Sequence, residues 1–187
     1  VESDKVGARF GHVVATAGDV NGDGYSDVLV GAPIFANGQV AEGRAHLYLG
    51  SALGLAMFAA WTAESNQADA NFAWSLATAG DVNGDGYSDV IVGTYFTSKV
   101  NVYLGSASGL GASAAWTVVG DQPNAEFGSS LAPAGDVNGD GYSDAIVGAY
   151  IYRTGQVSHG RTFVYYGGGG DGLDRIENEW IACYGDG

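Results

Sequence analysis

Residues 18–27 read Gly-Asp-Val-Asn-Gly-Asp-Gly-Tyr-Ser-Asp, and the same ten residues recur unchanged at 80–89 and 135–144. Recurrence of a block this long indicates internal repetition, which decides the architecture before any other feature of the chain. The blocks begin 62 and then 55 residues apart. The 187 residues therefore contain three similar units.

Other residues recur at matching positions relative to this block. A Phe precedes each copy by eight residues, a Gly follows it by four, and a Trp comes near the end of each unit: Phe10, Phe72, Phe127; Gly31, Gly93, Gly148; Trp61, Trp116, Trp180. After that Gly, the first and third units carry seven residues more than the second. A length difference confined to one place indicates a surface loop.

Each unit is predicted to contain four short strands. In the first unit these cover residues 10–17, 27–32 and 44–49 and the surroundings of Trp61. The run 28–30, Val-Leu-Val, has no polar alternation, as expected of a strand covered on both faces. No segment combines helical periodicity with capping residues, so we expect no helix. The predicted units are residues 1–62, 63–117 and 118–187.

The repeated loop supplies oxygen donors at its positions 1, 3, 5 and 9, with the backbone carbonyl of position 7 between them. A Gly at position 6 permits the sharp turn that such a loop needs. Carboxylate, amide and carbonyl oxygens without His or Cys favour a hard cation, and six or seven ligands favour Ca²⁺. The predicted ligands of three Ca²⁺ sites are Asp19, Asn21, Asp23, Tyr25, Asp27; Asp81, Asn83, Asp85, Tyr87, Asp89; and Asp136, Asn138, Asp140, Tyr142, Asp144.

Three other interpretations of this loop fit the sequence less well. EF-hands place a bidentate Glu at position 12 and continue into a helix, whereas Val30, Val92 and Val147 stand there and an apolar strand follows. Dockerin loops fail in the same way. A metal-free Asp/Asn/Gly turn explains one copy but is a poor account of three identical ones. We expect the metal to be structural, tying the first strand of each unit to the second.

The landmarks together resemble the FG-GAP repeat of the integrin α-subunit propeller. The matching residues are Phe10-Gly11 with Gly31-Ala32-Pro33, then Phe72 with Gly93, then Phe127-Gly128 with Gly148-Ala149. Four antiparallel strands per unit suit a propeller blade, so the expected fold is an all-β β-propeller of three blades. Propellers have four to eight blades. The expected arrangement is thus a partial ring, or a ring completed by oligomerisation, for example by two copies giving six blades.

The resemblance also implies where recognition occurs. In integrin α propellers the calcium loops lie away from the ligand, which contacts the opposite face. The corresponding segments here are 34–45, 96–99, 151–162, 63–71 and 118–126. The resemblance does not transfer any particular integrin ligand.

Charge and motifs narrow the function. The formal net charge of −14 disfavours nucleic acid and simple adsorption to anionic membranes, and no apolar stretch is long enough to span a bilayer. No catalytic motif is present, and His12, His46 and His159 fall at unrelated repeat positions. We therefore expect a non-enzymatic, extracellular scaffold that binds protein. The alternatives are a lectin-type propeller, with Tyr95, Phe96, Tyr150 and Tyr152 as candidate sugar platforms, and an accessory module of a secreted enzyme.

Overall fold

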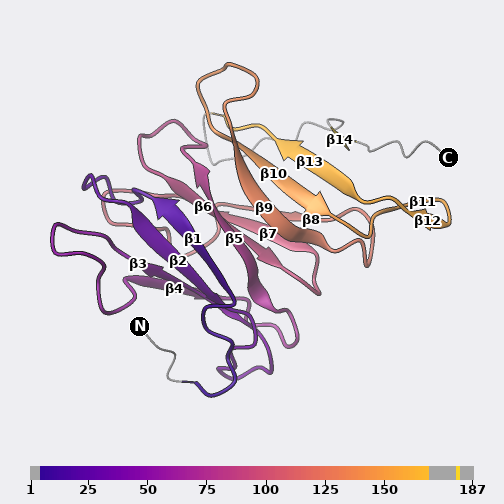
Figure 1. Ribbon diagram of the computed structural model, residues 1–187, viewed down its shortest axis with the longest axis horizontal. Helices are drawn as coiled ribbons and strands as arrows, with labels where there is room; N and C mark the ends of the chain where they lie inside the picture. The colour runs from indigo at the N-terminus through magenta and orange to yellow at the C-terminus, as the bar shows by residue number, and fades with distance from the viewer. Residues whose placement is uncertain (1–4, 169–179, 182–187) are drawn as a thin grey trace.

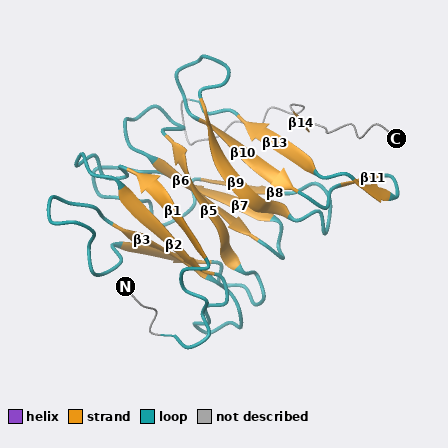
Figure 2. Cartoon of the chain, in the orientation of Figure 1, coloured by secondary structure: helices purple, strands orange, loops and turns teal. Residues whose placement is uncertain are grey.

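The chain folds into strands, turns and loops. The computed structural model describes residues 5–168 and 180–181, and no helix occurs in these ranges (Figures 1 and 2). Three four-stranded antiparallel sheets follow one another along the chain, one from each repeat. The expected all-β class and four-stranded units are confirmed, and the three sheets do not close into a ring.

The sheets share one topology, in which strands pair in chain order. The first sheet contains β1 (Val13–Gly18), β2 (Asp27–Ala32), β3 (Arg44–Tyr48) and β4 (Trp61–Glu64). The second contains β5 (Phe72–Gly80), β6 (Asp89–Thr94), β7 (Lys99–Tyr103) and β8 (Trp116–Val119). The third contains β9 (Phe127–Gly135), β10 (Asp144–Ala149), β13 (Arg161–Tyr165) and β14 (Trp180–Ile181), and a separate hairpin pairs β11 (Arg153–Thr154) with β12 (Val157–Ser158).

The predicted bounds of the first and third strands of the first sheet differ from the observed ones. The first strand begins at Val13 rather than Phe10, because Arg9 and Gly11 have φ angles of 56° and 84° and the His12 N–H donates to the Arg9 carbonyl in a turn. The third strand ends at Tyr48, one residue early. The β11–β12 hairpin lies in an insertion that had been predicted only as a loop.

Successive sheets pack face to face through recurring aromatic pairs. The Trp61 ring of β4 meets the Tyr103 ring of β7 edge-on, with centroids 4.9 Å apart. Trp116 of β8 meets Tyr165 of β13 in the same way at 5.2 Å. These two recurring tryptophans therefore pack between successive sheets, whereas the side chain of Trp180 lies outside the described residues.

The middle sheet is covered on both faces. All six residues of β6 are buried, and its central residues 90–92, Val-Ile-Val, are apolar without alternation. One apolar cluster fills the space between the first and second sheets and another the space between the second and third. The outward face of β1 has no such cover among the described residues, and Val14 is 65% exposed there. The middle sheet is thus the one whose two faces are both interior.

Candidate metal loops and recognition face

Each repeated loop joins the first two strands of its sheet and is curled by its own first Asp. In the loop 18–27, Asp19 Oδ1 accepts from the N–H of Gly22 (2.7 Å) and of Asp23 (3.1 Å). Its Oδ2 accepts from the N–H of Gly24 (2.8 Å). The loops led by Asp81 and Asp136 repeat this pattern with distances within 0.1 Å. The curl is therefore encoded within a few residues of sequence.

The donors at positions 3 and 5 lie beside this curl. The Asn21 Nδ2 donates to Asp23 Oδ2 (2.9 Å), and Asp23 Oδ1 accepts from the Tyr25 N–H (3.0 Å). The other two loops make the same pair of contacts. Three of the predicted donor side chains in each loop are thus gathered in one exposed turn.

The last Asp of each loop has a structural role that the sequence reasoning missed. Asp27 is fully buried, its Oδ2 accepts from the Val20 N–H (2.9 Å), and its Oδ1 accepts from the Gly50 N–H (2.8 Å). Asp89 and Asp144 hold the equivalent amides in their sheets. This carboxylate joins the loop to the end of the third strand, and the recurring Gly after that strand was the available signal.

Burial also affects the protonation of this carboxylate. Desolvation raises the pKa of Asp89 to about 7, the N–H groups of Gly105 and Val82 lower it, and the charges of Asp85 and Asp81 raise it. Burial raises the pKa of Asp27 as well, again with contributions from its two loop carboxylates. Each loop therefore concentrates three acidic groups, and none contains a Lys, Arg or His.

The donor set fits a hard divalent cation, because such an ion would relieve the mutual repulsion of three carboxylates and prefers oxygen ligands. In the described ranges, however, no three Asp, Glu, His or Cys side chains already surround a common point. The loop oxygens face backbone N–H groups instead. The ligand assignment for the fifteen residues named above accordingly stays a prediction.

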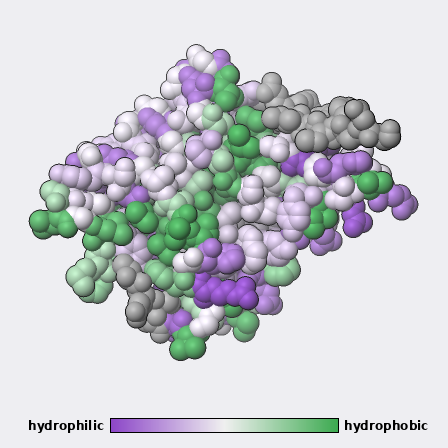
Figure 3. All heavy atoms as spheres, in the orientation of Figure 1, coloured by the Kyte–Doolittle hydropathy of each residue, from purple (hydrophilic) through white to green (hydrophobic). Residues whose placement is uncertain are grey.

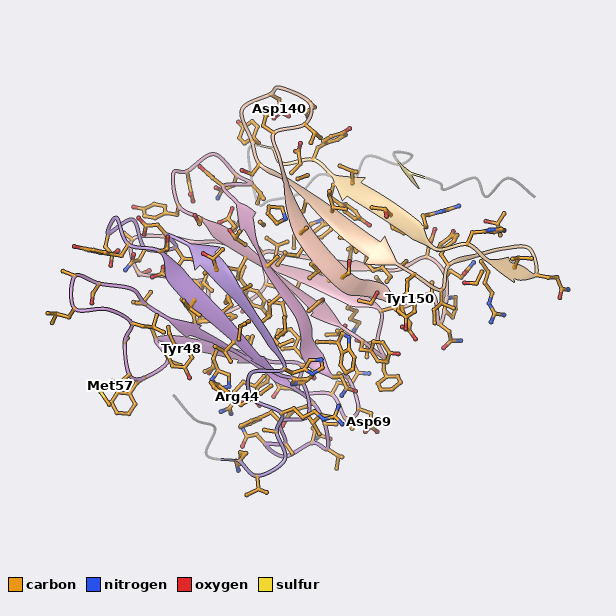
Figure 4. The ribbon with its side chains drawn as sticks, viewed as in Figure 1. Arg44, Tyr48, Met57, Asp69, Asp140 and Tyr150 are labelled. Carbon is orange, nitrogen blue, oxygen red and sulfur yellow. The ribbon has the colours of Figure 1, made fainter. Side chains whose placement is uncertain are left out.

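The other end of the sheets carries a cavity. Figure 4 shows Asp140 at the tip of a repeated loop and Tyr150 at the far end of the adjoining strand β10. Beside Tyr150, a cavity of about 580 Å³ opens between the second and third sheets. Its lining includes Trp74, Tyr95, Tyr150, His159 and Arg161. His159 and Arg161 belong to the segment 151–162 expected to form part of the recognition face, whereas Trp74, Tyr95 and Tyr150 lie outside the expected segments.

Aromatic rings form one continuous series along this cavity. Trp74 stacks on Tyr95 with centroids 4.5 Å apart and planes 27° apart, and His12 packs against Trp74 at 4.6 Å. Phe96 meets the Tyr95 ring edge-on at 4.8 Å and is largely exposed. Trp74 has no counterpart in the other repeats, so the sequence had offered no role for it.

Beneath the series, Glu126 fixes the orientation of a ring. The Tyr95 hydroxyl donates to Glu126 Oε1 (2.8 Å), and this carboxylate raises the pKa of Tyr95. Of the other predicted sugar-platform residues, Tyr152 lies apart from the series and packs against Phe163 and Arg161.

The three histidines do not lie together. His46 is buried in the first sheet, with its ring near those of Phe10, Phe35 and Tyr48, and so packs in the core. His12 and His159 both lie by the cavity.

Comparison with known proteins identifies related repeat sequences. The sequence profile described as FG-GAP repeat matches residues 10–48, and the profile described as FG-GAP-like repeat matches 81–147. Mouse integrin alpha-IIb is 35% identical over 162 residues, covering 80% of this chain and 16% of the integrin. Human integrin alpha-7 is 32% identical over 173 residues, and chicken integrin alpha-V is 34% identical over 163 residues. These two alignments include 85% and 79% of this chain but only 14% and 15% of the integrins. The chain therefore spans about a sixth of the length of its curated relatives.

Proposed function

The chain belongs to the FG-GAP repeat proteins and is integrin α-like, and on that premise we propose that it is a calcium-stabilised, extracellular propeller segment that binds a protein ligand. The observation that carries this proposal is the division of each sheet into two ends. One end bears a loop that is identical in three repeats, and the other bears connections that differ in length and sequence between repeats, with a cavity beside them. Constant scaffold and variable surface loops are typical of binding proteins.

Calcium would be held by the carboxylates, amide oxygens and position-7 carbonyls of the three loops. There it would supply a strong positive charge that joins the turn to the strands on either side. Asp27, Asp89 and Asp144 support this role from the protein side, because each already links its loop to the end of the third strand. Sites in extracellular modules can be weak, with Kd values of about 10⁻⁴–10⁻³ M, because external calcium is abundant.

Calorimetric titration of the chelator-treated chain with Ca²⁺ tests this part. We expect three bound ions, and two for Asp140→Asn, which removes one charged donor. Asp69→Asn, outside the loops, is the charge-matched control and should still bind three. Each site filled at ten times its Kd adds about 1.4 kcal/mol to the free energy of unfolding. An unchanged melting temperature between millimolar Ca²⁺ and chelator would refute a structural metal.

Ligand binding is proposed at the cavity end. The aromatic series offers a broad apolar contact, which is typical of the centre of protein interfaces. Segments 34–45, 63–71, 96–99, 118–126 and 151–162 would form the surrounding contact surface. Surface plasmon resonance against a panel of extracellular matrix proteins tests the assignment. Trp74→Ala should weaken any binding found, whereas Phe58→Ala, at an exposed ring on the first sheet's β3–β4 turn, should leave it unchanged.

A carbohydrate ligand is the second candidate, supported by the stacked Trp74 and Tyr95 rings and the exposed Phe96. Flat aromatic faces beside polar groups such as Arg161 and His159 suit a sugar ring. A glycan array separates the two: tight, selective sugar binding lost in Trp74→Ala would replace the protein-ligand proposal. In either case we propose that the chain acts by binding and not by catalysis. The described residues contain no helix long and apolar enough to cross a membrane.

A further inference from the structure

A second cavity, of about 280 Å³, lies between the first and second sheets and shares no lining residue with the cavity beside Tyr150. Glu64 ends β4 and Lys99 begins β7, so this cavity lies at the end of the sheets away from the repeated loops. Two segments expected to form the recognition face, 63–71 and 96–99, both line it. We call it the polar cavity.

Strand β7 turns one of its two faces to the polar cavity. Its residues alternate: Lys99, Asn101 and Tyr103 line the cavity. Val100 and Val102 point the other way and are completely buried in the cluster between the second and third sheets. The strand therefore presents a lysine, an amide and a phenol in one row.

The corresponding face is filled by rings in the other two sheets. At the position of Asn101 the first sheet carries His46 and the third carries Phe163. Each of these rings meets the repeated Phe of its own sheet edge-on, with centroids 5.2 and 5.3 Å apart. In the second sheet the repeated Phe is Phe72, and it lines the polar cavity together with Asn101. The loss of a ring at this position leaves space beside Phe72.

A basic residue begins the third strand of every sheet, but its surroundings differ. The Arg44 guanidinium lies 3.7 Å from the centre of the Phe35 ring, and the Arg161 guanidinium lies 3.8 Å from that of Tyr152. Both rings come from the connection that is seven residues shorter in the second repeat. There the ammonium group of Lys99 has no ring contact, ion pair or hydrogen bond among the described residues.

The short connection fixes the backbone of Lys99. Thr94 Oγ1 donates to the Lys99 carbonyl (3.0 Å) and accepts from the Lys99 N–H (3.0 Å). It also accepts from the Thr97 hydroxyl (2.7 Å). Thr94 is 2% exposed, so these bonds are shielded from water. The lysine is thus held at the rim of the cavity with its charged end available to a ligand.

The charges along the polar cavity favour an anion. Glu64 is neutralised by Arg44, whose Nε donates to its Oε1 (2.6 Å), so the charge of Lys99 is left over. Asn101 Oδ1 accepts from the Thr117 hydroxyl (2.9 Å), which leaves Asn101 Nδ2 as a donor. Figure 3 shows strongly hydrophilic side chains gathered beside the place where Figure 4 labels Arg44. On a chain of net charge −14, an unpaired ammonium and an amide donor in one cavity are suited to a carboxylate.

We propose that the polar cavity binds the carboxylate of an Asp or Glu side chain of a protein ligand, with Lys99 supplying the charge and Asn101 a hydrogen bond. Its volume of about 280 Å³ suits one side chain, being below the range of about 300–1,000 Å³ that is typical of sites for whole small molecules. The rings that line it, Phe72 and Tyr103, are 2% and 6% exposed, so neither offers a face on which a sugar could stack. This assignment rests on the proposed function for the protein nature of the ligand and on the cavity for its carboxylate.

NMR titration of the ¹⁵N-labelled full chain in millimolar Ca²⁺ tests the site, with acetyl-glutamate amide as the probe and acetyl-glutamine amide as its neutral isostere. We expect the first probe to shift the Lys99 backbone signal and the Asn101 side-chain amide with saturation, and the second to shift them little. Lys99→Met should weaken binding by about tenfold or more, because it removes a charge-assisted hydrogen bond. Lys5→Met is the charge-matched control, since Lys5 is the chain's other lysine and does not line the cavity.

Filling the polar cavity gives an independent check. Asn101→Phe introduces the ring that Phe163 supplies in the third sheet, and it should abolish the shifts in a chain that circular dichroism shows to be folded. Equal shifts by the glutamate and glutamine compounds would overturn the proposal. So would binding that survives both Lys99→Met and Asn101→Phe. Tighter binding of glucuronate than of the glutamate compound would replace the acidic side chain with a sugar acid and would equally overturn it.

Trp74→Ala separates this site from the cavity beside Tyr150. Trp74 lines only that other cavity, so its replacement should leave the glutamate titration unchanged. A protein ligand that binds through Trp74 while the glutamate compound fails to bind would contradict the carboxylate site alone. Binding of the glutamate compound without any protein ligand would contradict the proposed function alone.

Discussion

Gly84→Ala examines the contact between neighbouring loops most directly. The residue has a φ angle of 77°, where a side chain costs about 1–2 kcal/mol. The new methyl group would also stand 2.6 Å from Tyr142 Cε1, and relieving such overpacking costs about 1–3 kcal/mol more. Gly86→Ala, two residues along, has a φ angle of 90° and no neighbour within 4 Å among the described residues, so only the first cost applies.

The expected difference between the two variants is therefore about 2 kcal/mol, which corresponds to roughly 4–8 °C in melting temperature for a chain of this size. Urea denaturation followed by tryptophan fluorescence, in the presence and absence of Ca²⁺, measures it through the midpoint at constant slope. A double variant with Tyr142→Ala supplies the cycle: removing the ring should cost less in the Gly84→Ala background than in the parent chain. Equal losses for Gly84→Ala and Gly86→Ala, or strictly additive effects in the cycle, would refute the reasoning.

Three further outcomes are expected. Asp89→Ala should lower the free energy of unfolding by about 2–5 kcal/mol in chelator, because it leaves two buried N–H groups without their acceptor; a loss below 1 kcal/mol would contradict the bracing role. Burial raises the pKa of Tyr103 to about 12 from 10.0, so the hydroxyl ionises first in the unfolded chain and the free energy of unfolding falls between pH 10 and 12. Tyr103→Phe should reduce that fall in a series of denaturation curves, and an unchanged pH dependence would count against the burial of this hydroxyl. Trp61→Phe removes a hydrogen bond between the first and second sheets and should lower the free energy of unfolding by about 0.5–1.5 kcal/mol, measured by thermal melting. An unchanged melting temperature would contradict a contribution from this bond.

Local features of the fold were accessible from the sequence because they depend on neighbouring residues. The curl of the first loop is made by hydrogen bonds that Asp19 accepts from backbone N–H groups no more than five positions away. The buried strand β2 follows from its own uninterrupted apolar run. The first strand of the first sheet was placed three residues too early, because a positive φ at Arg9 cannot be seen in a pattern of residue types.

The functional end was less accessible. The sequence marked Tyr95 and Tyr150 as aromatic residues in variable loops, but it gave no reason to group them with Trp74, an unrepeated residue on another strand. Only the packing of the second sheet against the third brings these side chains to one cavity. The buried role of Asp27 was hidden for the same reason, since its partner Gly50 is 23 residues away.

The sequence by itself determined the repeat, the loop chemistry and the four-stranded unit, since each is specified within some sixty residues and is written three times. The tertiary structure alone decided which residues of the constant block bind its own loop and which contact the next sheet. The same Tyr and Ser are half-buried at 87–88 and 142–143 and exposed at 25–26, while their sequence is unchanged. The physical reason is that burial depends on the neighbouring sheet, and a sheet's neighbour is not part of its own sequence.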